Sequence, residues 1–422
     1  MNSADSLADH LRAAARDRPT EIALRYAGKT WTFGEWLADA RLLAKRLPAL
    51  PTSLTLAGNG LELARHAYAC SLQDRAFFPV DGRPPEMLPT VNSPLSDVAL
   101  IISTSGSEGR PRAVLLGNSQ LDAAAAASNA RLPLRPGDQW LNCLPLYHIG
   151  GQSILWRCAR AGATVLLHDG FVAERVAEAL VSQPVTHISL VPAMLARLLE
   201  LGAPPSGLRV AMVGGAALSR PLYDAACAAG WPLYPSYGMS ETAAQVASFD
   251  PAAGPWQEGQ VGLPMPGHEV RIGKDGRIGL RGPQIMLGYG DGSGPDGEGW
   301  LTTGDLGRLD AGGRLTVLGR ADDMLISGGR NVHPQEIESC LAACPGVRDI
   351  AVAGRPDAIW GDRIVAFIVG NIEPACVLAH ARRHLPSAAV PREFRTIDRL
   401  PRNAGGKLER AALRLLAAEG AP

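Results

Sequence analysis

The 422-residue sequence lacks the features that would place it in several large classes of protein. Lysine plus arginine and aspartate plus glutamate number 41 each, so no net charge attracts nucleic acid or an anionic membrane. No uncharged apolar run reaches the length of about 18 residues that suggests a membrane-spanning helix. The N-terminal residues mix Asp and Arg and lack the apolar core of a signal peptide. We therefore expect no nucleic-acid partner, no membrane span and a cytoplasmic protein.

Cysteine is sparse, and the pattern of the cysteines excludes the common metal and redox motifs. The seven are Cys70, Cys143, Cys158, Cys227, Cys340, Cys344 and Cys376. Their number is odd, and no two of them have the Cys-x-x-Cys spacing. Two cysteines four residues apart on a helix are not a zinc ligand set. We expect reduced, mostly buried thiols and no zinc site.

What the sequence does contain is the composition and the patterning of an α/β enzyme. Hydrophobic residues make up 46% and charged residues 19%, which is typical of a folded chain, and the length allows two or three domains. The spacing of apolar residues predicts a helix over 5–16 and a hairpin over 21–33. Strand-like and helical runs alternate over 95–250, which predicts doubly wound, mostly parallel sheets.

Two changes of texture follow along the chain. Glycine and proline punctuate short strands over 251–320, which predicts a small antiparallel β unit. After Arg320 the pattern is that of a compact α+β module. We therefore predict a large N-terminal domain, 1–320, and a small C-terminal domain, 321–422, with the boundary near Asp322.

Four segments carry residue types suited to nucleotide chemistry, although each has a simpler interpretation. The small residues of 103–113 can wrap phosphate, or form a surface loop. The segment 234–243 offers an aromatic face and Glu241 as a magnesium ligand, or a capped helix start. The segment 300–338 offers Asp305 for a ribose diol, or a plain hairpin with an ion pair. Lys407 follows a Gly-rich stretch, where a solvated lysine is the common case.

Taken in order, these segments resemble the AMP-forming adenylating superfamily, which contains acyl-CoA synthetases, peptide-synthetase adenylation domains and luciferases. The resemblance runs from about Ser103 to Arg410. It implies ATP and Mg2+ as cofactors, and a mobile C-terminal domain with its hinge at Asp322.

The resemblance also implies roles for individual residues. Lys407 matches the catalytic lysine and Glu241 the metal carboxylate. The implied ATP and AMP contacts are Thr104, Ser105, Gly106, Ser107, Gly109, Arg112, Gly214, Gly215, Ala216, Ser236, Tyr237, Gly238, Met239, Ser240, Asp305 and Arg320. Within this set, Tyr237 would stack on adenine, and Asp305 and Arg320 would contact ribose. Such a set suits attack of a carboxylate on the α-phosphate, because cation, metal and N–H groups stabilise the charge that develops.

Two segments narrow the resemblance to aryl acid CoA ligases, such as those acting on 4-chlorobenzoate and o-succinylbenzoate. They are LPLYHIGGQS, at 144–153, and GRADDMLISGGRNVHPQEIE, which begins at Gly319. This resemblance implies that His148 has a catalytic role at the acyl pocket, which Gly238 also lines. It further implies that Gly328, Gly329 and Trp360 contact coenzyme A. The simpler interpretations are that His148 is a hydrogen-bonded histidine of the core and that Trp360 packs against its own domain.

The sequence also departs from the family pattern. Glu108 stands where relatives usually have Thr, and Arg112 where they usually have Lys, which changes the charge and the geometry of the phosphate loop. Arg330 replaces an acidic residue that is common in the aryl ligases. The segment before Ser103 is short, which predicts a more open pocket or one completed by a partner chain.

We expect an enzyme that activates a carboxylic acid, aromatic by resemblance, as its adenylate and transfers the acyl group to coenzyme A. Two alternatives stay open: a ligase that loads the phosphopantetheine arm of an acyl carrier protein, and a noncatalytic adenylate-binding protein. A homodimer is also left open.

Overall fold

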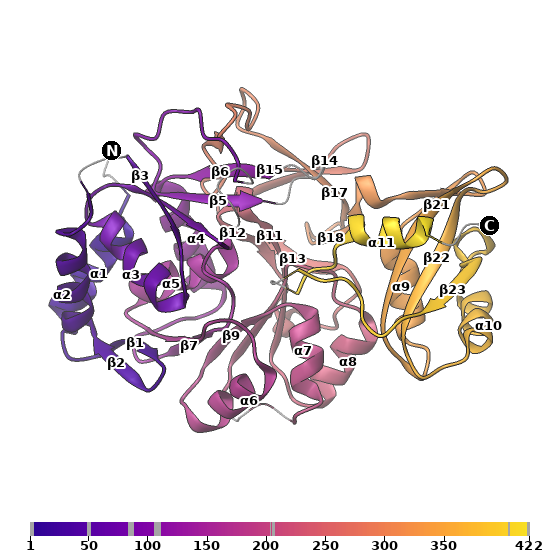
Figure 1. Cartoon of the computed structure of the whole chain (residues 1–422), viewed down its shortest axis with the longest axis horizontal. Coiled ribbons are helices and arrows are strands. Elements are labelled where there is room, and N and C mark those ends of the chain that lie inside the picture. Colours follow the sequence, from indigo (N-terminus) through magenta and orange to yellow (C-terminus); the bar gives the residue numbers. More distant parts are fainter. Residues whose placement is uncertain are drawn as a thin grey trace.

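The computed structural model of the chain has a larger N-terminal part and a smaller C-terminal part (Figure 1). It describes residues 4–48, 52–82, 88–104, 111–202, 204, 207–403 and 406–419. The helices are α1 (Leu7–Asp17), α2 (Phe33–Ala44), α3 (Gly60–Ser71), α4 (Asn118–Arg131), α5 (Ile149–Ala161), α6 (Ala173–Ser182), α7 (Pro192–Leu199), α8 (Arg220–Ala228), α9 (Pro334–Ala342), α10 (Pro374–His384) and α11 (Arg410–Ala418). No helix among these residues is long and apolar enough to span a membrane.

The central sheet of the N-terminal part has thirteen strands in the order β14-β15-β17-β18-β13-β12-β11-β10-β9-β7-β8-β1-β2. The strands are β1 (Ile22–Tyr26), β2 (Lys29–Thr32), β7 (Gln139–Asn142), β8 (Thr164–Leu167), β9 (His187–Leu190), β10 (Val210–Val213), β11 (Leu233–Met239), β12 (Ala244–Ser248), β13 (Gln260–Pro264), β14 (Glu269–Ile272), β15 (Arg277–Arg281), β17 (Leu301–Leu309) and β18 (Leu315–Arg320). The run from β11 to β1 is parallel, and the strands from β11 to β14 pair antiparallel.

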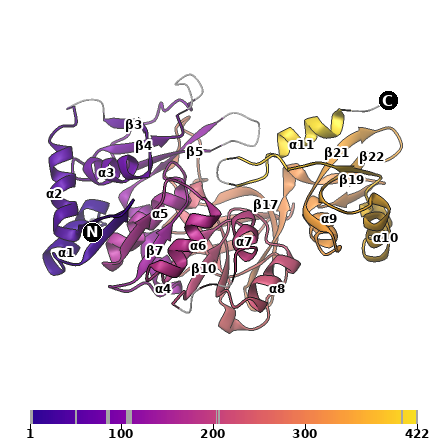
Figure 2. The same cartoon turned by 60° about the horizontal axis from the view of Figure 1, so that its bottom comes forward.

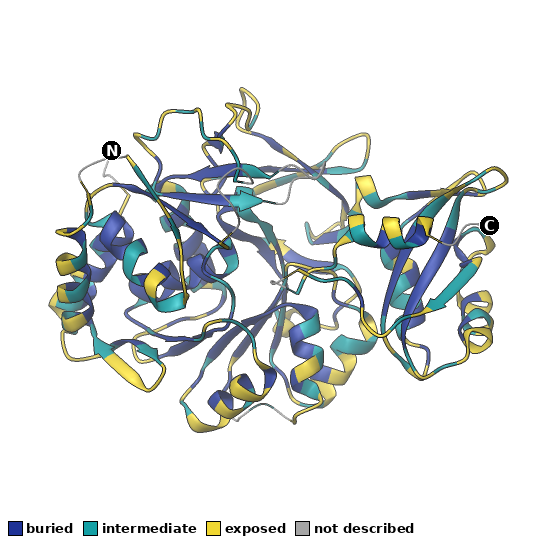
Figure 3. Cartoon of the chain, viewed as in Figure 1, coloured by how far each residue is buried: buried dark blue, intermediate teal, exposed yellow. Residues whose placement is uncertain are grey.

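Helices cover both faces of the parallel strands, as a doubly wound sheet requires. On β7, Trp140 packs into one hydrophobic cluster with α4 and α5, whereas its neighbour Leu141 packs into a second cluster with α6, α7 and α8. This follows from the alternation of side chains along a strand. Figure 3 shows the strands as buried layers between helices with exposed outer faces. The predicted α/β fold class is therefore confirmed.

The antiparallel strands of the β unit predicted for 251–320 are continuous with the large sheet. It is not a separate sheet, because β13 pairs with β12 of the parallel half and also with β18. The hydrophobic clusters of the described residues nevertheless divide near the predicted boundary. Three contain only residues before Arg320, and two contain only residues from Leu325 on.

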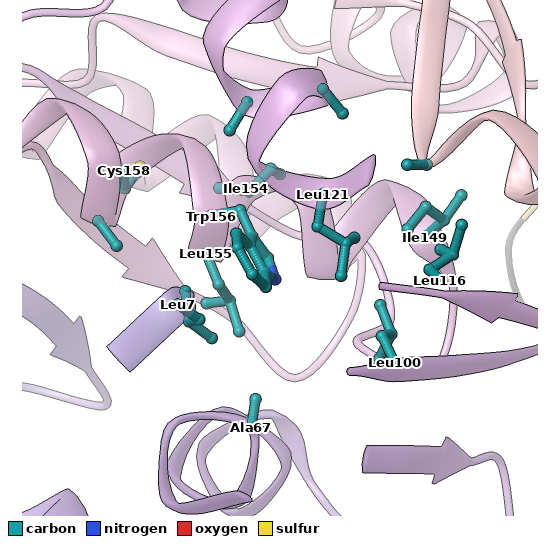
Figure 4. Packing of buried hydrophobic residues seen from close by; sticks show 14 of the residues in the cluster. Leu7, Ala67, Leu100, Leu116, Leu121, Ile149, Ile154, Leu155, Trp156 and Cys158 are labelled. Carbon is teal, nitrogen blue, oxygen red and sulfur yellow. The ribbon is translucent and has the colours of Figure 1, made fainter. Parts of the chain in front are cut away.

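The first hundred residues contribute to both sheets of the N-terminal part. The helix predicted for 5–16 is α1, which starts at Ser6 because the Ser6 hydroxyl accepts the Asp9 N–H in a capping box. The predicted hairpin is β1–β2, and Gly28 takes φ +78° in its turn. Leu7 packs with α3 and α5 in the core (Figure 4).

A second sheet has five strands in the order β16-β6-β5-β4-β3. Its strands are β3 (Ser53–Ala57), β4 (Ala76–Val80), β5 (Leu100–Thr104), β6 (Arg112–Leu116) and β16 (Gly288–Tyr289). Strand β16 is supplied by a segment more than 170 residues after β6, and its Tyr289 pairs with Val114. This pairing brings residue 289 next to the phosphate-loop strands.

The C-terminal part is a sheet in the order β20-β19-β22-β21, with β23 paired to β22. Its strands are β19 (Leu325–Ser327), β20 (Arg330–Val332), β21 (Val347–Asp357), β22 (Gly361–Gly370) and β23 (Glu393–Thr396). Helices α9 and α10 pack on one face and α11 on the other. The segment before α11 extends back to the N-terminal part (Figures 1 and 2).

Candidate active site

The predicted site residues at the ends of β10 and β11 lie where the parallel half of the large sheet meets the antiparallel half. Strand β11 has parallel β10 on one side and antiparallel β12 on the other. Gly214, Gly215 and Ala216 follow β10, and the predicted residues from Ser236 to Met239 end β11. The Ser236 hydroxyl donates to the Val213 carbonyl at 3.2 Å and ties the two strand ends together. Ligands of α/β sheets bind at such carboxyl ends of strands.

Glu241 lies on a tight turn that follows β11. Ser240–Thr242 form a single 3-10 turn, and Ala243 then takes φ +52°, a left-handed conformation that alanine rarely adopts. The Thr242 hydroxyl stabilises the turn, because it donates to the Ala244 carbonyl at 2.7 Å and accepts the Met239 N–H at 3.0 Å. The turn leaves the Glu241 carboxylate half-buried, and its Oε1 accepts a hydrogen bond from the Tyr289 hydroxyl at 2.9 Å.

Asp305 and Arg320 face each other across the β17–β18 pair. The buried Asp305 carboxylate accepts a hydrogen bond from the Tyr237 hydroxyl at 2.6 Å, and its other oxygen lies 3.5 Å from Arg320 Nη1. Burial, followed by the Asp305 charge and hydrogen bond, raises the pKa of Tyr237, so its hydroxyl stays a donor. Gly304 lies beneath the guanidinium, where a Cβ would come 2.7 Å from Arg320 Nη2.

Lys407 reaches into this group from the C-terminal part. A Cβ on Gly215, which has φ +76°, would lie 3.2 Å from Lys407 Cε. Withdrawal of the ammonium from water by the surrounding protein lowers the pKa of Lys407; the carboxylates of Glu241 and Asp305 oppose this shift. The residue as a whole is nevertheless exposed, so Lys407 remains accessible to solvent beside these groups.

The loop that presents Lys407 is held at both of its ends. The Lys407 N–H donates to Asn403 Oδ1 at 3.1 Å, and Arg402 pairs with Asp349 at 2.9 Å. The loop also approaches the N-terminal part closely, because a Cβ on Gly406 would lie 2.9 Å from Val191. These contacts hold Lys407 beside Gly215, where the charges of Glu241 and Asp305 act on it, although both are at least one hundred residues away in the sequence.

The predicted phosphate loop is described only at its two ends. Ser105, Gly106, Ser107, Glu108 and Gly109 lie outside the described residues. Thr104 ends β5, and its hydroxyl lies 3.4 Å from the carbonyl of Arg112, which begins β6. The Arg112 guanidinium pairs with Asp291 at 3.2 Å and stacks 3.3 Å over the Tyr289 ring.

On the predicted acyl side, His148 is the residue directly before α5, and its ring meets that of Tyr147 at 4.7 Å. Gly238 has a packing requirement of its own, because a Cβ there would lie 2.0 Å from the Ala244 carbonyl oxygen. Its absence of a side chain therefore permits the close approach of β12 to β11.

The residues predicted for coenzyme A lie together on the C-terminal sheet. The Gly328 N–H donates to the Trp360 carbonyl at 2.9 Å, and a Cβ on Gly328 would touch the indole at 3.3 Å. A Cβ on Gly329 would meet open space. Arg392, which the sequence did not single out, stacks 4.1 Å over the Trp360 ring.

At the predicted hinge, Asp322 lies between arginines of both parts. Its carboxylate accepts from Arg320 at 3.1 Å and lies 4.0 Å from Arg277. On the C-terminal side, Arg414 donates to the Asp322 carbonyl at 3.0 Å and to Asp323 at 2.7 Å. A further contact between the two parts joins the Ser339 hydroxyl to Glu258.

Family models match both parts of the chain: that of AMP-binding enzymes over 66–290 and that of the AMP-binding enzyme C-terminal domain over 336–407. The chain belongs to the AMP-binding enzymes. The resemblance predicted from four motifs is thereby confirmed.

Curated relatives are 2-succinylbenzoate–CoA ligases. That of Bacillus cereus is 38% identical over 343 residues, which cover 77% of this chain and 71% of that protein. That of Bacillus mycoides is 36% identical with the same coverage. The prediction of an enzyme among the AMP-forming acid–thiol ligases is confirmed by these relatives and by the family models.

Solved structures agree over nearly the whole chain. The o-succinylbenzoate CoA synthetase of Bacillus subtilis with its acyl-adenylate intermediate has a TM-score of 0.86 and 29% identity, covering 96% of this chain and 97% of that one. The same enzyme has been solved with ATP and magnesium ion. ATP-bound MatB of Rhodopseudomonas palustris has the same fold, with a TM-score of 0.88, 23% identity and coverage of 98% and 99%. ATP and Mg2+, predicted here as cofactors, are thus ligands of a solved relative.

Two contacts of the site were missed by sequence reasoning. Tyr289 lies outside the four segments that suggested nucleotide chemistry. Thr242 lies within one of them, at 234–243, but no role was predicted for it. The only sequence signal for Thr242 is a hydroxyl directly after the carboxylate, where it can bond the backbone of a turn. Tyr289 has no local signal, since only the β6–β16 pairing brings it to Glu241.

Proposed function

We propose that this protein is an AMP-forming ligase that activates an aromatic carboxylic acid and transfers the acyl group to coenzyme A. The observation that carries the proposal is Lys407, which is directed beside Gly215 toward the carboxylates of Glu241 and Asp305. A noncatalytic nucleotide-binding protein would not need a lysine with a lowered pKa brought there from a second part of the chain.

In the first half-reaction, a substrate carboxylate oxygen attacks the α-phosphorus of ATP and pyrophosphate leaves. The Lys407 ammonium donates hydrogen bonds to the substrate carboxylate and to the α-phosphate oxygens, where negative charge develops. Tyr237 and the end of β10 hold the adenine side, and Asp305 with Arg320 holds the ribose. The short hydrogen bond from Tyr237 fixes the Asp305 carboxylate for this contact.

The residues around Glu241 fit a magnesium ion held jointly with nucleotide phosphates. No cluster of three or more acidic, His or Cys side chains occurs in the described part of the chain, so the protein offers no complete cage. Magnesium usually binds through one or two carboxylates plus substrate phosphates and waters. Glu241 supplies one such carboxylate, half-buried and oriented by Tyr289. The metal would neutralise phosphate charge.

In the second half-reaction, the thiolate of coenzyme A attacks the acyl carbon and AMP leaves. We propose that the C-terminal domain, 321–422, rotates about Asp322, which withdraws Lys407 and brings Gly328 and Gly329 to the acyl-adenylate. Trp360, with Arg392 on its ring, would then contact coenzyme A. Asp322→Pro would fix the hinge, and wild-type rates of both half-reactions in that variant would contradict the rotation.

The relatives point to the acid to try first. Because the 2-succinylbenzoate–CoA ligase of Bacillus cereus is 38% identical to this chain, 2-succinylbenzoate heads a panel of aryl and alkyl acids. His148 and Gly238 are the residues we assign to the acyl side.

The test is acid-dependent release of pyrophosphate from ATP and Mg2+, measured with and without coenzyme A. Lys407→Ala should lose acid-dependent release, whereas Lys29→Ala, an exposed lysine on the β1–β2 hairpin, should keep it. Thioester formation would identify coenzyme A as the acceptor. Pyrophosphate release without thioester would indicate an acyl carrier protein as the acceptor. ATP binding without pyrophosphate release for any acid would contradict the proposal that the protein is an enzyme.

Three further predictions concern the setting of the enzyme. A cytoplasmic location is testable by cell fractionation, and a homodimer by light scattering of the purified chain. A pocket that is more open or completed by a partner would appear as an activity that depends on protein concentration.

A further inference from the structure

Tyr289 is the one tyrosine of the described chain whose hydroxyl donates to the predicted metal carboxylate. It ends β16 and is half-buried, and its hydroxyl lies 2.9 Å from Glu241 Oε1. The backbone on both sides holds it in place. The Met286 N–H donates to the Glu241 carbonyl at 2.9 Å, and the Gly290 N–H donates to the Ala113 carbonyl at 2.8 Å.

Arg112 contacts the ring of the same tyrosine. Tyr289 pairs with Val114, so Arg112, two residues before Val114 on β6, lies on the same side of the sheet. Its guanidinium carbon is 3.3 Å from the centre of the Tyr289 ring, a cation–π contact. Its Nη2 also pairs with Asp291 at 3.2 Å and donates to the Ser293 hydroxyl.

Asp291, the partner of Arg112, is itself held in place by hydrogen bonds. The carboxylate accepts the Ser293 N–H at 2.9 Å and the Ser293 hydroxyl at 2.5 Å in the turn after β16. Arg112 is therefore held on one side by this turn and on the other by the aromatic ring. The Nη2 group of Arg112 is thus directed to the protein acceptors Asp291 and Ser293.

We propose that Tyr289 is a positioning residue that orients Glu241 for the metal ion of ATP, and that Arg112 acts on the metal site by clamping Tyr289. This inference rests on the proposed function, in which Glu241 binds that metal. The physical reason is competition for the Glu241 carboxylate, because the Lys407 ammonium beside Gly215 attracts it. A hydrogen bond to Oε1 holds the carboxylate on the β16 side and leaves its second oxygen to bind a hard cation.

The first test replaces Tyr289 by Phe, which keeps the ring under Arg112 and removes only the hydroxyl. We expect the Mg2+ concentration for half-maximal ATP–pyrophosphate exchange to rise about tenfold, as is typical when an outer partner of a metal ligand is lost. The rate at saturating Mg2+ should stay within about twofold. A readout independent of activity is Mn2+ binding to the enzyme with ATP, followed by electron paramagnetic resonance, and it should weaken by the same factor.

Tyr68→Phe is the matched control. It also removes a buried tyrosine hydroxyl, one that lies 3.4 Å from the Leu155 carbonyl in the core. It should lower thermal stability without changing the Mg2+ or Mn2+ dependence. An unchanged metal dependence in Tyr289→Phe, or an equal change in Tyr68→Phe, would overturn the proposal.

The second test asks whether Arg112 acts through Tyr289. Arg112→Met should weaken Mn2+ binding as Tyr289→Phe does, and the double variant should be little worse than either single variant. A contact between Arg112 and phosphate predicts the opposite: a higher KM for ATP and an effect that adds fully to that of Tyr289→Phe.

Failure of the proposed function gives a different result from failure of this inference. If wild type shows no acid-dependent exchange but binds Mn2+ with ATP, the enzyme assignment fails and the Mn2+ titrations still decide the role of Tyr289.

Discussion

Gly215 is a residue at which the proposed two-step cycle leaves little room for a side chain. Its φ of +76° is unfavourable for any other L-residue, and a Cβ would lie 3.2 Å from Lys407 Cε and 3.5 Å from Val191 Cγ1. Gly215→Ala therefore adds both backbone strain and a contact with the catalytic lysine. The strain persists throughout the cycle, whereas the contact exists only while Lys407 occupies the cleft.

These two effects can be separated in magnitude. Alanine in the left-handed region costs about 1–2 kcal/mol of folding free energy. The contact at 3.2 Å requires the end of the lysine side chain to shift by a few tenths of an ångström, and we expect this to slow adenylation about tenfold. Gly230→Ala is the matched control, because Gly230 has φ +83° and a Cβ there would meet nothing within 4 Å.

The assay compares the two half-reactions in both variants. ATP–pyrophosphate exchange reports adenylation, and thioester formation from preformed acyl-adenylate reports the second step. We expect both variants to lose similar stability in urea unfolding, and only Gly215→Ala to slow exchange, with its second step unchanged. Equal exchange rates in the two variants would refute the placement of Lys407 against Gly215.

Three further predictions follow from particular contacts. Because the pKa of Lys407 is lowered, chiefly by loss of water, and the protonated form is required, exchange should decline at a pH below the ordinary lysine value of 10.5. Arg320→Gln removes a positive charge that lowers the pKa of Lys407, so the decline should move to higher pH in the pH–rate profile. A shift to lower pH would contradict this effect of the Arg320 charge. Burial lowers the pKa of His187 to about 4, so between there and 6.5 the unfolded chain binds a proton that the folded chain does not. The free energy of unfolding should therefore fall by about 2 kcal/mol from pH 7 to pH 5, and His187→Gln should abolish this fall in urea titrations. A Cβ at Gly304 would displace Arg320, so Gly304→Ala should raise the KM for ATP about tenfold with less change in kcat; an unchanged KM would argue against a ribose contact.

The sequence by itself determined the elements and the family. Apolar periodicity, capping residues and turn residues act over a few positions, so α1, the β1–β2 hairpin and the alternation over 95–250 were predictable from local chemistry. The motifs were equally local. Glu241, Asp305 and Lys407 were each identified from the residues beside them, although nothing in the sequence measures the distance between them.

Tertiary structure decided what depends on contacts between distant segments. Sequence patterns predicted a small antiparallel β unit over 251–320, and only the pairing of β13 with β12 showed that it is joined to the main sheet. The same limit applied to Arg112, whose partners Tyr289 and Asp291 lie more than 170 residues later in the chain. A side chain's charge can be read from its position in a motif, but its partner is set by strand pairing and packing. For this reason the sequence predicted a set of catalytic groups, and only the fold showed which of them face Lys407 and which are held by other side chains.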